Sequence, residues 1–201
     1  MRRVLLLLGL LVGTAWAMQE PQQQDQEPVY VFGTSVVIPA GLQGAIYYIS
    51  HSAPTIEDLE KKKPRGTIYT SSLNIPPQDY KLGFPGISKR LEWFAIDYRG
   101  KFWIQKAGDY KFELTADDGA MLYVDGQLVV DNSGLHPPVT LHGAAGLREG
   151  IHTIRVVYFQ GIKYQVALVL KIAPPGQEYR IFSTNEFKPP ATWTGPDDTA
   201  K

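Results

Sequence analysis

Two adjacent aspartates, Asp117 and Asp118, are the residues of this chain best suited to hold a cation. Successive side chains of an extended strand point to opposite faces, so the two carboxylates can share one ion only where the backbone bends sharply. Carboxylates that converge also repel each other, and a bound cation would offset that repulsion. The alternative is a solvated turn in which one of the two aspartates accepts a hydrogen bond from a nearby backbone N–H.

The residues around the aspartate pair alternate as strands do. Ahead of the pair, apolar side chains share one face: Tyr110, Phe112 and Leu114. After it, residues 120–124 form a second predicted strand and residues 127–131 a return strand. Asp125-Gly126 between them is typical of a two-residue hairpin, because both central residues must adopt positive φ. The pattern predicts an acidic turn and a tight hairpin inside one sheet.

This stretch, Ala107 to Asn132, resembles the core of the protective-antigen-type domain, a module named after an anthrax toxin component. The module also occurs in yeast flocculins and epithelial adhesins, in bacterial adhesins and inserted in glycosidases. Further segments match the family in the right order: residues 41–48, 98–100 and 150–159. The resemblance covers roughly residues 40 to 172 and implies an antiparallel β-sandwich or barrel with a jelly-roll-like strand order.

The resemblance also implies a calcium site. Lectin-type members join the two aspartates by a cis peptide and bind calcium through both. In the adhesins, a loop after the late strand adds a side-chain amide and backbone carbonyls, and the matching loop here contains Gln160 and Gly161. The yeast adhesins have Asn where this chain has Gln160, and Gly161 permits close backbone approach. Ligands that are all oxygen favour calcium over zinc or copper. The alternative is an ordinary hairpin loop.

In the related lectins, calcium takes vicinal sugar hydroxyls as ligands, so Asp117 and Asp118 are also expected to hold the sugar. Lys163, in the second loop, either lowers the ion affinity through its charge or meets a ligand hydroxyl. Three aromatic residues near these loops are candidates for stacking on the C–H face of a sugar: Tyr164, Tyr80 and Phe84. The alternative for each ring is packing in the core.

Composition agrees with an all-β domain. The 201 residues are enough for one domain, and 11 Tyr and 8 Phe alternate with 19 Gly and 15 Pro, which favours strands joined by many loops. The formal net charge of zero suggests no nucleic-acid partner. Because the chain has no cysteine, disulfides, thiol catalysis and cysteine-bound zinc are excluded.

The remaining elements follow from local patterns. Further strands are predicted over residues 29–32, 45–49, 67–70, 91–98, 101–105, 139–142, 152–159, 166–172 and 179–182. One short inserted helix is predicted between Pro54 and Pro64, because Thr55 can cap it and acidic residues precede three lysines. Residues 73–89, rich in Pro and Gly, are predicted as a long loop. Trp93 and Trp103 are predicted in the core.

The N-terminal residues 1–17 have the pattern of a signal peptide. Arg2 and Arg3 precede a short apolar run, and Ala15-Trp16-Ala17 fits a cleavage site, with an uncleaved anchor as the alternative. Residues 18–28 are predicted as a flexible leader, 29–188 as the domain and 189–201 as a disordered tail. We therefore expect a secreted or periplasmic protein that is not inserted in the membrane after cleavage.

Catalytic motifs are missing. The four histidines show no HExxH spacing, and neither a GxSxG elbow nor a phosphate-binding GxxxxGK[ST] loop occurs. We expect a non-catalytic, calcium-dependent carbohydrate-binding module of lectin or adhesin type, with its two site loops at the same end of the sandwich. The alternatives are a structural or protein-interaction domain that binds another surface protein without sugar, and a small secreted glycan hydrolase.

Overall fold

A computed structural model describes residues 41–87, 92–162 and 164–191. The signal peptide, the leader, the strand expected over residues 29–32 and most of the expected tail lie outside these described residues, as does Lys163. No helix in the described part of the chain is long and apolar enough to cross a membrane.

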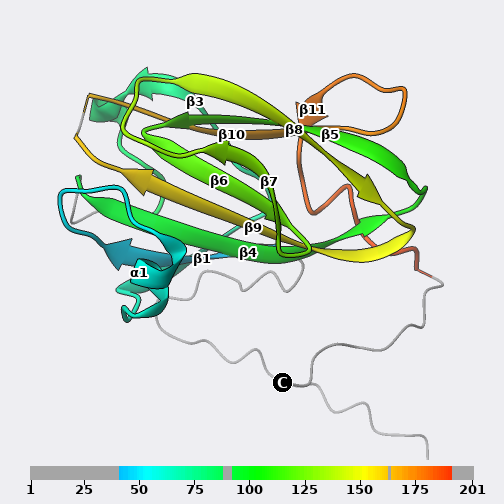
Figure 1. Ribbon diagram of the computed structural model, residues 1–201, viewed down its shortest axis with the longest axis horizontal. Helices are drawn as coiled ribbons and strands as arrows, with labels where there is room; N and C mark the ends of the chain where they lie inside the picture. Colours follow the sequence, from blue (N-terminus) through cyan, green and yellow to red (C-terminus); the bar gives the residue numbers. More distant parts are fainter. Residues whose placement is uncertain (1–40, 88–91, 163, 192–201) are drawn as a thin grey trace, which may run out of the picture. The chain divides into compact units, whose positions relative to one another are not determined.

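Six strands form one antiparallel sheet in the order β2-β1-β4-β9-β6-β7 (Figure 1). Their bounds are β1 (Leu42–Tyr48), β2 (Gly66–Thr70), β4 (Phe94–Ile104), β6 (Gly119–Val124), β7 (Gln127–Asn132) and β9 (Gly150–Gln160). At the predicted hairpin between β6 and β7, Asp125 and Gly126 have φ values of 49° and 77°. The predicted tight turn is therefore confirmed.

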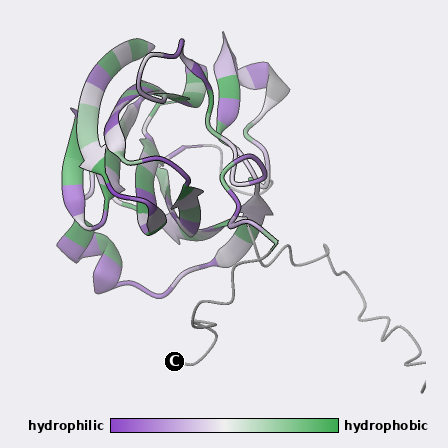
Figure 2. Ribbon diagram, turned by 90° about the vertical axis from the view of Figure 1, so that its right-hand side faces the viewer, coloured by the Kyte–Doolittle hydropathy of each residue, from purple (hydrophilic) through white to green (hydrophobic). Residues whose placement is uncertain are grey.

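The second sheet has the order β11-β10-β5-β8, and β3 pairs with β10 as well. Its strands are β3 (Asn74–Asp79), β5 (Gly108–Asp117), β8 (Val139–Leu147), β10 (Gln165–Ala173) and β11 (Arg180–Ile181). Figure 2 shows hydrophobic and hydrophilic residues alternating along the strands. The predicted face of Tyr110, Phe112 and Leu114 is buried in the core, and the prediction of an all-β antiparallel sandwich is confirmed.

The short helix α1 (Ile56–Glu60) packs on the outer side of the six-stranded sheet. Thr55 caps it as predicted: its side chain accepts from the N–H of Asp58, whose carboxylate accepts from the N–H of Thr55. Leu59 lies in a second apolar cluster with Val157 and Phe159 of β9. This cluster explains why every residue of β9 from Val156 to Gln160 is buried, as the apolar residues on both faces predict.

The structure corrects three local predictions. Residues 73–89 are not one long loop, because β3 and a 3₁₀ helix, η1 (Tyr80–Leu82), occupy half of them. Two prolines hid β3 from the sequence pattern, and its place at the edge of β10 tolerates them. The strands expected on either side of Arg99 are one strand, β4. Trp93 and Trp103 are half-buried instead of lying in the core.

Gly143→Ala is expected to lower the free energy of unfolding by about 1 to 3 kcal/mol. A Cβ at residue 143 of β8 would lie 2.1 Å from the carbonyl oxygen of Val129 on β7, a backbone atom that cannot move aside alone. Gly146→Ala on the same strand is the matched control, because its Cβ would meet only the mobile carboxylate of Asp109, 3.4 Å away. Urea denaturation measures both, and equal stability of the two variants would contradict the prediction.

Candidate functional site

Asp117 and Asp118 lie where the chain passes from one sheet to the other. Asp117 ends β5 in the five-stranded sheet, and Gly119 begins β6 in the six-stranded sheet. The prediction that the acidic turn and the hairpin lie inside one sheet is therefore wrong. The peptide bond between the two aspartates is cis, as the family resemblance implies.

The end of β9 meets this junction. The N–H of Gly161 donates to Oδ2 of Asp118 across 2.6 Å, and Nε2 of Gln160 lies 3.4 Å from the same oxygen. The acidic turn and the loop after β9 are thus at the same end of the sandwich, as predicted. Gly161 also has little room for a side chain, because a Cβ there would lie 2.6 Å from Leu135 and 3.1 Å from the Asp118 carboxylate.

Sequence reasoning missed a third segment, residues 133–138 between β7 and β8. The backbone N–H of His136 acts to lower the pKa of Asp118, and Leu135 lies against Gly161. The sequence did hold a signal for this contact. A regular hairpin closed at Asp125-Gly126 brings the end of its return strand beside Ala120, so the residues that follow must return beside the acidic pair. In the structure a bulge shifts the register by one residue, and Asn132 lies opposite Ala120.

Both carboxylates are largely buried, and only that of Asp118 accepts hydrogen bonds from the neighbouring loop. Burial, together with the charge of Asp118, raises the pKa of Asp117 to about 6, against the opposing influence of His136. Burial also raises the pKa of Asp118, although the N–H of Gly161 acts in the other direction. In the part of the chain that the structure describes, no hydrogen bond reaches the carboxylate of Asp117, which makes this a place where positive charge would be stabilising.

Gln160 is fully buried, and its amide connects the two loops. Its Oε1 is 2.5 Å from the hydroxyl of Tyr158, which also lies 2.8 Å from the carbonyl oxygen of Asp117. Its Nε2 is 3.1 Å from the carbonyl oxygens of both Ile162 and Gln165. With Oδ2 of Asp118, three oxygens therefore surround one buried position, which the amide nitrogen of Gln160 takes.

The donor set fits calcium by its chemistry. Carboxylate, carbonyl and amide oxygens are the ligands that calcium prefers in proteins. Among the described residues, no group of three or more His, Cys, Asp or Glu is placed to hold a metal. A cation at this position would therefore depend on the carbonyls of Ile162 and Gln165 and on Oδ2 of Asp118, with Asp117 as the adjacent second charge.

The expected sugar platform of Tyr80 and Phe84 is wrong. Both rings are buried in the core, where Phe84 stacks on Tyr158 with 4.8 Å between ring centroids. Tyr164 instead is 78% exposed and follows the Gln160 loop. Two aliphatic side chains at the same loops are also exposed, Leu135 and Ile162. Exposed apolar side chains thus lie on the loops of the site, and of these three residues the sequence predicted only Tyr164.

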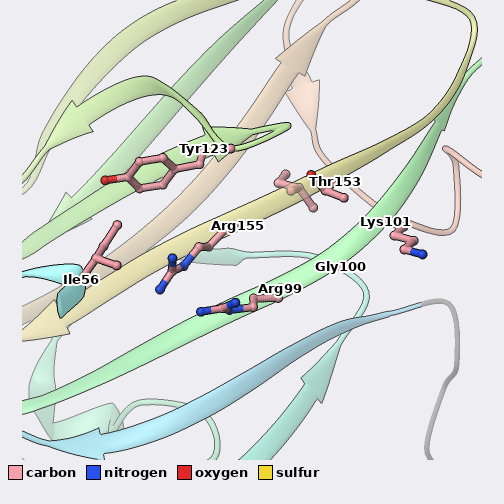
Figure 3. Close-up of a pocket in the computed structure, with 9 residues that line it drawn as sticks. Ile56, Arg99, Gly100, Lys101, Tyr123, Thr153 and Arg155 are labelled. Atoms are coloured by element: carbon pink, nitrogen blue, oxygen red, sulfur yellow. The ribbon is translucent and has the colours of Figure 1, made fainter. Parts of the chain in front are cut away.

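A separate cavity of about 590 Å³ lies on the outer face of the six-stranded sheet, beside Tyr123, Thr153 and Arg155 (Figure 3). Arg99 and Arg155 point into this region from β4 and β9, and both bind the buried carboxylate of Asp97. The carboxylates of Asp97 and Glu60 offset the charges of these two arginines. The cavity adjoins the middle of β9, away from the end that carries Gln160.

The model of the PA14 domain family matches residues 83–185, which is half of the chain. The solved PA14 domain of the MpAFP antifreeze protein superposes with a TM-score of 0.60 at 20% identity, over 73% of this chain and 88% of that one. The PA14 sugar-binding domain from an RTX adhesin gives 0.59 at 21% identity, over 72% and 96%. No curated protein matches the sequence.

An anti-sigma factor domain-containing protein from Clostridium clariflavum is similar over 76% of this chain, with a TM-score of 0.58 at 21% identity. The chain spans about half of that protein, since 48% of its length is covered. At these identities the likeness to solved structures shows the fold alone.

Proposed function

Because the chain belongs to the PA14 domain family, we propose that it is a non-catalytic carbohydrate-binding module that holds its ligand through calcium. The convergence of oxygens beside Asp117 and Asp118 carries this proposal. The sugar-binding domain of the RTX adhesin supports the ligand class, because its fold is the one described above. Neutral sugars suit the site, since its charged oxygens already belong to the protein.

Different residues of the proposed site would bind the ion and the sugar. Asp117 and Asp118 supply the negative charge that holds the cation, and the carbonyls of Ile162 and Gln165 add neutral oxygen ligands. When bound, calcium supplies open coordination positions for two neighbouring hydroxyls of a sugar. The ring of Tyr164, which is exposed after the Gln160 loop, would cover the apolar C–H face of that sugar.

Isothermal calorimetry with calcium, followed by a glycan array with and without a chelator, tests the proposal. We expect heat on calcium addition, a rise in melting temperature, and glycan binding that the chelator removes. If calcium gives neither heat nor a shift in melting temperature, the proposal fails. If calcium binds but no glycan does, the metal site stands and the carbohydrate-binding function falls.

A structural or protein-interaction domain is the second candidate. The observation that favours it is the amide of Gln160, whose N–H groups already satisfy the oxygens of Ile162 and Gln165 without an ion. The same calorimetry separates the two candidates. A release assay for reducing sugars checks that the protein is not a hydrolase, and we expect no activity.

We also propose that the protein acts outside the cytoplasm. Arg2, Arg3 and the apolar run that follows them have the pattern of an export signal, and Ala15-Trp16-Ala17 offers a cleavage site. Mass spectrometry of the protein from the secreted and periplasmic fractions is expected to show a chain that starts at Met18. An intact chain in the membrane fraction would contradict cleavage.

A further inference from the structure

The hydroxyl of Tyr158 has one proton but two acceptors. It lies 2.8 Å from the carbonyl oxygen of Asp117 and 2.5 Å from Oε1 of Gln160. A tyrosine hydroxyl donates one hydrogen bond, so one of these two oxygens must face its lone pairs. If the amide of Gln160 turned by half a rotation, Nε2 would donate to the hydroxyl, which would then donate to Asp117 without conflict.

The other end of the same amide has the opposite requirement. It faces three oxygens, those of Asp118, Ile162 and Gln165, and Nε2 supplies the N–H donors that they need. Turning the amide would put Oε1 against these oxygens, an arrangement that is repulsive unless a positive charge joins it. The Oε1 side and the Nε2 side of the Gln160 amide are therefore satisfied in different orientations of the amide, and a bound cation would favour the turned one.

We propose that the Gln160 amide is a two-position switch in the calcium site, an inference that rests on the function proposed above. Without calcium, its NH₂ group stands in for the ion among Asp118, Ile162 and Gln165. With calcium, the amide turns and draws back, so that Oε1 faces the ion and Nε2 donates to Tyr158. The NH₂ group and the ion compete for one position, because that position is buried and Gln160 fills it.

This competition has two consequences. The loops of Asp118 and Gly161 are held together without calcium, because the Gln160 NH₂ group and the Gly161 N–H both donate to the Asp118 carboxylate. The calcium affinity is lowered by whatever the NH₂ contacts contribute, so that Gln160 sets the concentration at which the site fills. A side chain that keeps an oxygen but has no NH₂ group should bind the ion more tightly and hold the empty loops less well.

Nuclear magnetic resonance on the full chain, labelled with ¹⁵N, tests the switch. The Gln160→Met variant identifies the side-chain NH₂ signals of Gln160 by their loss. In calcium-free protein we expect these protons to show slow exchange with water and weak cross-relaxation to the Tyr158 ring. On calcium addition, cross-relaxation to the ring protons next to the hydroxyl should grow several-fold. Strong cross-relaxation between the Gln160 NH₂ protons and the Tyr158 ring before calcium is added would contradict the proposal that this NH₂ group occupies the position of the ion.

Calorimetry on the same samples keeps this inference separate from the proposed function. If calcium does not bind, the proposed calcium site is refuted. If calcium binds but the contacts of the Gln160 NH₂ group do not change, only the proposed switch is refuted. Gln160→Glu is a second arm: we expect at least tenfold tighter calcium binding and a lower melting temperature without calcium. Unchanged or weaker calcium binding by this variant would show that the NH₂ group does not compete with the ion.

Discussion

Asp117→Asn is expected to abolish calcium binding while leaving the fold intact. The substitution keeps the shape of the side chain and removes one of the two charges that attract the ion, so we expect affinity to fall at least hundredfold, by about 3 kcal/mol. Saturating calcium at about a thousand times its wild-type dissociation constant should stabilise the wild type by about 4 kcal/mol and the variant by about 1.4 kcal/mol at most. Calorimetry and thermal melts with and without chelator measure both effects.

The calcium-free protein provides an internal check of the same variant. Burial raises the pKa of Asp117 to about 6, above its value in the unfolded chain, so at pH 7 the ionised group destabilises the folded state. Removing its charge should therefore leave calcium-free stability equal or raise it by about 1 kcal/mol. Loss of calcium binding then cannot be attributed to unfolding.

Asp109→Asn is the matched control. Asp109 is an exposed residue of the same strand, and its substitution changes the net charge of the protein by the same amount. We expect wild-type calcium binding. If Asp117→Asn binds calcium as Asp109→Asn does, the ion does not bind at the acidic junction.

Asp97→Ala is expected to lower the free energy of unfolding by about 3 kcal/mol. The carboxylate of Asp97 is 3% exposed and accepts four hydrogen bonds, two from Arg99 and two from Arg155, at 2.8 to 3.0 Å. Arg155 belongs to β9 and also lies 3.5 Å from Glu60 of α1. One carboxylate thus connects β4, β9 and the helix, and its removal leaves the largely buried Arg155 without its main partner.

Glu186→Ala is the control for Asp97. Glu186 pairs with Arg180 at the surface, where both side chains are more than one third exposed, so its loss should change stability by less than about 1 kcal/mol. Urea denaturation at low and at high salt measures both variants, and only the Asp97 effect should persist at high salt. A loss below about 1 kcal/mol for Asp97→Ala would mean that the two arginines are solvated in the variant.

The sequence alone determined the local structure and the identity of the acidic pair. Alternation predicts the buried face of β5, Asp125-Gly126 predicts the hairpin, and Thr55 predicts the helix start. Each of these rules depends on residues only a few positions apart, and each agrees with the structure. The position of Asp118 beside the Gln160 loop followed from strand direction together with the family resemblance.

Only the tertiary structure decided which sheet each strand joins and which side chains the sheets cover. The turn at Asp117 looked like a turn within one sheet, because local sequence does not distinguish this from a passage between two sheets. Phe84 has the residue type of a sugar-binding ring, but it is stacked on Tyr158 in the core. The N–H of Gly161 meets the carboxylate of Asp118, 43 residues away, because β6 and β9 are neighbours in one sheet. These facts depend on contacts between distant residues, which no local pattern records.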